Sequence, residues 1–136
     1  MAEKFFSESW LKAAHEAERA VTEESRKLIK DPDTFTHVLA FEVADHPGVN
    51  SYLRFEAGRS VAWTATPVPE DDVWARFVGS LDAWRACAEG KASASTQVMG
   101  GKIKITKGDM MEAFANAPAL DMLARLFGEV DTDWDV

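Results

Sequence analysis

The residues best suited to acid–base or metal chemistry gather between positions 37 and 46. His37, Glu42, Asp45 and His46 lie close together there, and imidazole and carboxylate groups serve as zinc ligands and as general acids or bases. Their spacing is not the His-Glu-x-x-His pattern of a helical zinc site. In an alternating strand His37 and Glu42 fall on opposite faces. The segment therefore predicts neither a catalytic residue nor a metal ligand.

Other arrangements that carry out chemistry are incomplete in this sequence. No serine lies in the Gly-x-Ser-x-Gly elbow of hydrolases. The run GGKIKI fails as a phosphate-binding loop, because Thr96 stands where the first glycine is required. The acidic triplet at 70–72 could hold a metal, but capping of a following helix accounts for the same carboxylates. We expect no enzyme, no metal and no cofactor.

Cysteine usage and the N-terminus bear on the compartment. Cys87 is the single cysteine, so no disulfide can form within the chain. It lies in a helical run beside Trp84, where a packed small residue is the ordinary role. The first ten residues, MAEKFFSESW, lack the apolar core of a signal peptide. No apolar run approaches the roughly 18 residues of a membrane span, and we expect a cytoplasmic protein.

The length of the chain limits the number of domains, and its net charge limits the binding partners. A chain of 136 residues is expected to be one domain, 1–136, with an N-terminal helix (1–34), a core (35–128) and an acidic tail (129–136). The net charge of −8 opposes binding to nucleic acid and to anionic membrane surfaces. Lys102, Lys104 and Lys107 form either a solvated strand face or a small docking patch.

Periodicity predicts a long helix followed by three strands. Apolar residues recur at helical spacing from about Phe5 to Lys30, mostly as alanine, so this helix is expected to lie on a surface rather than to supply the core. Strands are predicted at 36–44, 50–57 and 60–66, the third with Val61 and Trp63 on one face. Their short turns favour an antiparallel meander covered on one face by helices, an α+β arrangement.

The second half of the chain alternates between helical and strand patterns. Acidic residues at 70–72 are expected to cap a helix that carries Val73, Phe77 and Leu81 and ends at Gly90. A strand follows at 101–106, with its isoleucines inward and its lysines outward. Asp109 with Glu112 has the capping-box spacing and starts a helix at Met110, which Pro118 interrupts. The tail from 129 is expected to be loosely held unless its tryptophan packs back.

The turn at 107–108 leads directly from this strand into two methionines. It is predicted to fold Met110, Met111 and Phe114 back over the face of Ile103 and Ile105. Methionine adapts to irregular apolar shapes, which suits either a bound lipid or a filled core.

The segment GKIKITKGDM at 101–110 resembles the signature of the sterol carrier protein family, with one extra residue at Lys107. The preceding EGK and GGK motifs have a similar spacing in that family, and EDDVWARFVGSL at 70–81 resembles one of its capped helices. The resemblance is good over about 70–127 and weaker but compatible over the predicted strands before it. By alternation ASASTQVM at 92–99 could be a strand, but the resemblance implies a short helix there.

The resemblance implies a mixed sheet of four to five strands and a tunnel between the sheet and the C-terminal helices. The tunnel would bind one apolar molecule, such as a fatty acid, fatty acyl-CoA, phospholipid or sterol. The small polar residues Ser93, Ser95 and Thr96 would enlarge that cavity, meet a head group of the ligand, or indicate that the cavity has been lost. The residues expected to contact the ligand, each of which could instead be core, are Phe77, Leu81, Trp84, Met99, Ile103, Ile105, Met110, Phe114, Leu123 and Phe127.

Two readings remain open on the sequence. The first is a monomeric carrier without nucleic-acid partners and without stable membrane insertion. The second is an interaction or dimerisation module with a filled core and no bound lipid, in which the N-terminal helix packs across a partner subunit.

Overall fold

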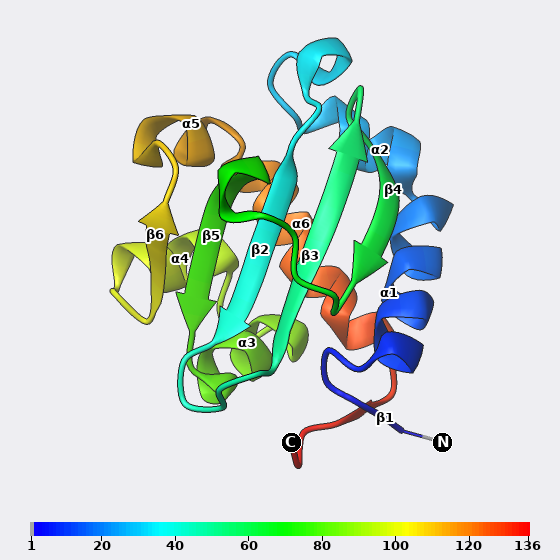
Figure 1. Cartoon of the computed structure of the whole chain (residues 1–136), viewed down its shortest axis with the longest axis vertical. Coiled ribbons are helices and arrows are strands. Elements are labelled where there is room, and N and C mark those ends of the chain that lie inside the picture. The colour runs from blue at the N-terminus through cyan, green and yellow to red at the C-terminus, as the bar shows by residue number, and fades with distance from the viewer. Residues whose placement is uncertain (1) are drawn as a thin grey trace.

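The computed structural model describes residues 2–136, and a five-stranded mixed sheet is its central element. The strand order is β4-β3-β2-β5-β6. Helices cover one face of this sheet, with α3, α4 and α6 behind the strands and α1 along β4 (Figure 1). The predicted α+β class and the number of strands are confirmed. The strands are β2 (Val38–Val43), β3 (Asn50–Glu56), β4 (Arg59–Thr64), β5 (Val73–Gly79) and β6 (Ile103–Lys107).

The helices are short, and several are separated by a single residue. They are α1 (Glu8–Ala20), α2 (Thr22–Lys27), α3 (Leu81–Ala88), α4 (Ala94–Met99), α5 (Met110–Ala115) and α6 (Ala117–Leu126). Three 3-10 turns lie at Pro32–Thr34, Glu70–Asp72 and Phe127–Glu129. A further two-stranded pair joins β1 (Glu3–Lys4) to β7 (Thr132–Asp133).

The predicted meander is present as β2, β3 and β4, all paired antiparallel. Leu53 and Phe55 are buried on the helix-covered side, as strand alternation predicts. In β4 the prediction that Val61 shares a face with Trp63 is wrong. Arg54 pairs with Ala62 whereas Phe55 pairs with Ser60, so Val61 is the extra residue of a bulge, and it is exposed.

The helix predicted from Val73 is a strand instead. β5 runs parallel to β2 and antiparallel to β6, with Phe77 opposite both Phe41 and Ile105. Helix α3 begins only at Leu81, where the Ser80 hydroxyl accepts a hydrogen bond of 3.1 Å from the amide of Ala83. The spacing Val73, Phe77, Leu81 satisfies a period of two as well as a helical period. Valine and aromatic residues favour the strand.

The N-terminal helix also departs from the prediction. It divides at Val21 into α1 and α2, and it does supply the core. Trp10 and Leu11 are completely buried, and the ring of Trp10 packs at 5.3 Å from that of Phe127. The apolar positions on which the prediction was based were mostly alanines and did not include Leu11. In the structure Leu11 is a bulky, buried residue of α1.

The C-terminal tail is held in place rather than loose. β7 pairs in parallel with β1, and Thr132 Oγ1 accepts a 2.8 Å hydrogen bond from the indole of Trp10. The ring of Trp134 lies 4.6 Å from that of Phe5. The tail therefore closes over the aromatic cluster that α1 contributes.

Several local predictions are confirmed. Asp109 accepts hydrogen bonds from the amides of Met111 and Glu112 at 2.8 and 3.3 Å, and α5 begins at Met110. Pro118 lies in the first turn of α6, directly after the break between the two helices. Residues 94–99 form the short helix α4 that the family resemblance implied.

Candidate functional site

A pocket between the sheet and the helices is the candidate site. Its walls come from α2, from the segment that follows α2, from three central strands, and from α5 and α6. The lining is almost entirely apolar: Ser25, Ile29, Phe35, Leu39, Phe55, Trp74, Phe77, Ala113, Asn116, Ala119, Leu120 and Leu123. Strand alternation places Leu39, Phe55 and Phe77 on this face of the sheet.

The pocket is small in this conformation. Its volume is about 40 Å³, room for little more than one or two water molecules. Sites for small organic ligands measure roughly 300–1,000 Å³. Side chains therefore fill most of the space between sheet and helices, and a lipid-sized molecule requires the walls to separate.

A polar mouth adjoins the apolar pocket and shares Phe35, Trp74 and Asn116 with it. Residues that line this mouth alone are mostly polar or charged: Lys30, Asp31, Thr34, His37, Glu112 and Ala115. The site as a whole is apolar inside and polar outside.

Backbone and side-chain contacts fix the geometry of the mouth. The Lys30 amide donates a 2.8 Å hydrogen bond to Asn116 Oδ1, which links the two sides of the opening. Asn116 Nδ2 donates to the carbonyl of Glu112 at 3.1 Å. The His37 ring stacks on Trp74 at 4.6 Å with 15° between the planes. Partial burial lowers the pKa of His37 from its usual 6.5, and the Glu112 carboxylate opposes this only in part.

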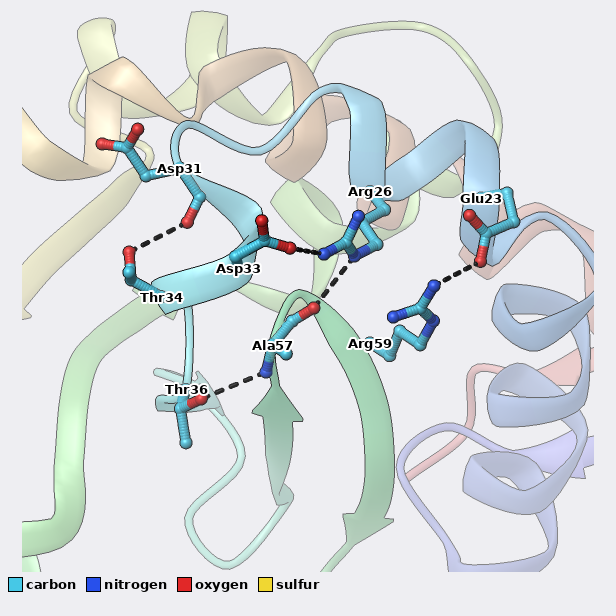
Figure 2. Close-up of polar contacts among 8 residues, drawn as sticks. All are labelled: Glu23, Arg26, Asp31, Asp33, Thr34, Thr36, Ala57 and Arg59. Atoms are coloured by element: carbon cyan, nitrogen blue, oxygen red, sulfur yellow. Dashed lines mark hydrogen bonds and ion pairs between the residues drawn. The ribbon is translucent and has the colours of Figure 1, made fainter.

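Residues 31–36, here called the strap, form one edge of the site and are held by a polar network (Figure 2). Arg26 Nε donates to the Ala57 carbonyl at 3.0 Å, and its Nη2 pairs with Asp33. The Ala57 amide donates to Thr36 Oγ1 at 3.1 Å. This network joins α2, the strap and the β3–β4 turn, and it positions Phe35 over the pocket.

Two of the ten predicted ligand residues, Phe77 and Leu123, line the pocket. Trp84, Ile103 and Phe127 are buried elsewhere in the core, and the Trp84 indole donates to the Glu42 carbonyl at 3.0 Å. Leu81 and Ile105 are half-buried against that core.

The prediction for the methionines is wrong in its geometry. Met110, Met111 and Phe114 are 53%, 81% and 36% exposed, and Met99 is 80% exposed. They do not cover the isoleucine face of β6. The residue of α5 that points inward is Ala113.

The pocket residues that sequence reasoning missed include all those of α2 and the strap. Leu39 and Phe55 could have been found, since strand alternation already put Phe55 on the inner face. Ile29 and Phe35 carry no comparable signal. Their role depends on how the strap folds across the end of the sheet.

The other side chains considered for catalysis or metal binding include Glu42 and Cys87. Glu42 pairs with Arg76 at 2.6 Å. Within residues 2–136 no three His, Cys, Asp or Glu side chains converge as a metal site would require. Cys87 is buried, as predicted, and burial together with the Asp121 carboxylate raises its pKa to about 11.

Among the helices within residues 2–136, none has the length and apolarity needed to cross a membrane.

Of the three lysines considered as a patch, Lys107 contacts the backbone carbonyl of Glu70 and lies 3.9 Å from its carboxylate. Lys102 and Lys104 are exposed. This arrangement favours a solvated strand face over a docking patch.

The model of the SCP-2 sterol transfer family matches residues 15–121, which include most of the chain and every pocket residue except Leu123. The chain belongs to this family. The predicted resemblance to sterol carrier proteins is thereby confirmed, including the strands before residue 70, where the resemblance was weaker. No curated protein matches the sequence.

Solved structures show the same fold at low identity. A conserved hypothetical protein of Thermus thermophilus, described as possibly a sterol carrier protein, is 20% identical with a TM-score of 0.74, over 98% of this chain and 94% of that one. A crystal structure of sterol carrier protein 2 is 21% identical with a TM-score of 0.75, over 93% and 99%. The apo form of sterol carrier protein 2 from Yarrowia lipolytica is 16% identical with a TM-score of 0.56, over 98% of each chain.

Proposed function

We propose that this member of the SCP-2 family binds an apolar small molecule without catalysis and carries it through the cytoplasm. Candidate classes are fatty acids, fatty acyl-CoA esters, phospholipids and sterols. The observation that carries the proposal is the pocket itself, which is almost entirely apolar and adjoins a polar mouth. Burial of ligand surface there would contribute about 25 cal/mol per Å² before ordering costs are subtracted.

The ligand would lie between the sheet and the pair α5–α6, with Phe77 and Leu123 on opposite sides of it. We expect the volume of about 40 Å³ to grow as the helical wall moves outward, since ligands select or induce open states of such sites. Among the other predicted ligand residues, the buried Trp84, Ile103 and Phe127 would act as packed support of this pocket.

Native mass spectrometry before and after extraction with organic solvent tests the proposal. A discrete adduct that disappears on extraction and is recovered as a lipid is the expected result. A matched variant, Ala113→Phe, places a ring in the pocket and should abolish the adduct, whereas Ala62→Phe on exposed β4 should not. An adduct of equal intensity in both variants would contradict binding in this pocket.

A second function, an interaction module with a filled core, is favoured by one observation. Met110 and Met111 expose apolar surface on α5 although the neighbouring pocket is nearly filled. Sedimentation of the wild type and of Met111→Gln distinguishes the two functions. A homodimer that the substitution dissociates, together with no lipid uptake, would support the module.

A further inference from the structure

We propose that the bound amphiphile has an uncharged, hydrogen-bonding head, such as a hydroxyl or an amide, and that this head lies in the polar mouth. This inference rests on the proposed function. It narrows the ligand to one chemical class, and it disfavours free fatty acids and phosphate-bearing lipids.

The position of the head follows from the continuity of the two pockets. The apolar pocket and the polar mouth share Phe35, Trp74 and Asn116, so they form one site with two ends. The inner end offers Leu, Ile, Phe and Ala side chains that suit an apolar tail. A polar head placed inside would lose its hydration without compensation, whereas in the mouth it keeps polar partners.

The charges around the mouth are unfavourable for an anion. Asp31 of the strap and Glu112 of α5 supply two carboxylates, and Lys30 supplies the single ammonium group among the residues that line it. Partial burial lowers the pKa of His37 from its usual 6.5, which favours the neutral imidazole. The lining therefore carries a net negative charge, in a chain whose net charge is also negative. A carboxylate or phosphate head would be repelled there.

The hydrogen-bonding groups that remain free suit an uncharged head. In the part of the chain that the structure describes, the ring nitrogens of His37 form no hydrogen bond. A neutral imidazole offers one donor and one acceptor. Thr34 Oγ1 donates to the Asp31 carbonyl at 3.0 Å and keeps its capacity to accept. A hydroxyl or amide can both donate and accept, so it can use these two groups together.

Lys30 is the residue of the mouth that could attract an anionic head group. Its ammonium group is exposed on a flexible side chain, and it could pair with an anionic head. Its charge is offset by the two carboxylates that line the same mouth. An anionic ligand would have to compete with both of them for this lysine.

Three ligands with the same tail test the assignment: dodecan-1-ol, dodecanoate and dodecylammonium, titrated at pH 7.5 by displacement of a fluorescent apolar dye. An alcohol enters any apolar pocket more readily than a carboxylate. The informative quantity is therefore the ratio of the Kd for dodecanoate to that for dodecanol, compared between variants.

Glu112→Gln removes one carboxylate from the mouth and should lower this ratio by about threefold or more, an effect that weakens as salt is added. Glu112→Lys should lower it further. Asp31→Asn provides a second test, since asparagine tolerates the left-handed backbone that Asp31 adopts at φ 51°. Glu129→Gln, on an exposed turn away from the mouth, should leave the ratio unchanged.

The outcomes separate the two proposals. Binding of the ligands with the same ratio in wild type, Glu112→Gln and Asp31→Asn would overturn the head-group assignment and leave the proposed function intact. Tightest binding of dodecylammonium would also overturn it, because the mouth would then select a cation. Binding of none of the three ligands to folded wild-type protein would overturn the proposed function itself.

Discussion

Truncation of Leu123 separates core packing from ligand binding more directly than any other change. Its side chain is 5% exposed and lines the pocket from α6. Leu123→Ala removes three carbons, which costs about 2.4 kcal/mol of transfer free energy, and the cavity left behind raises the loss to roughly 3–5 kcal/mol. The new space joins the existing 40 Å³ and enlarges the site.

Leu11→Ala is the matched control. Leu11 is fully buried in α1 but does not line the pocket. It loses the same atoms, and we expect a similar fall in the free energy of unfolding. The assay is urea unfolding followed by circular dichroism, with and without dodecanol. A ligand at one hundred times its Kd stabilises the native state by about 2.7 kcal/mol.

The two variants should respond differently to the ligand. Dodecanol should stabilise Leu123→Ala by more than it stabilises the wild type, because the enlarged pocket binds it more tightly. Leu11→Ala should gain no more than the wild type. Equal stabilisation of both variants, or none of Leu123→Ala, would refute the assignment of this pocket as the ligand site.

Three further predictions concern stability and reactivity. Gly128→Ala should cost about 1–3 kcal/mol by overpacking, since a Cβ would lie 2.2 Å from the Ala88 carbonyl oxygen, whereas Gly100→Ala, with its nearest atom at 3.4 Å, should cost little in thermal unfolding. The lowered pKa of His37 means that the unfolded state binds more protons near pH 6. The free energy of unfolding should therefore increase with pH up to about 6.5 and decrease as the pH falls below that value. In His37→Gln the urea midpoint, measured from pH 5 to 8, should depend less on pH. Cys87, with its pKa raised to about 11, should resist alkylation by iodoacetamide at pH 8 and react only after unfolding, which mass spectrometry would detect.

Local sequence signals predicted the elements that local interactions determine. The Asp109 cap, the break at Pro118 and the strands of the meander all depend on neighbours within a few residues, and the structure confirms them. β5 was missed because its apolar spacing fits helix and strand alike. Its pairing with β2, which decides between them, joins segments far apart in the sequence.

Prediction of the pocket lining depended on knowing how each element is oriented. Leu123 belongs to an apolar stripe of α6 and lines the pocket, whereas Phe77 lines it from β5 although its spacing was interpreted as helical. Met110 and Met111 follow the same kind of pattern, but α5 docks through Ala113 and leaves them in solvent. In a helix of six residues, a rotation of one position moves a side chain from core to surface. Periodicity alone cannot determine that rotation.

The space that a ligand needs must come from the helical wall of the pocket. On the opposite wall, Leu39, Phe55 and Phe77 lie on strands paired along both edges, so their displacement would break hydrogen bonds across the sheet. α5 is too short to be stable by itself. It is held by the buried side chain of Ala113, by the Asp109 cap and, through Asn116, by a hydrogen bond to the backbone of Lys30 across the mouth. An outward movement of α5 and the start of α6 would break that hydrogen bond, separate Ala113 from the pocket and open the apolar pocket at the polar mouth, where the head of an entering amphiphile would arrive last.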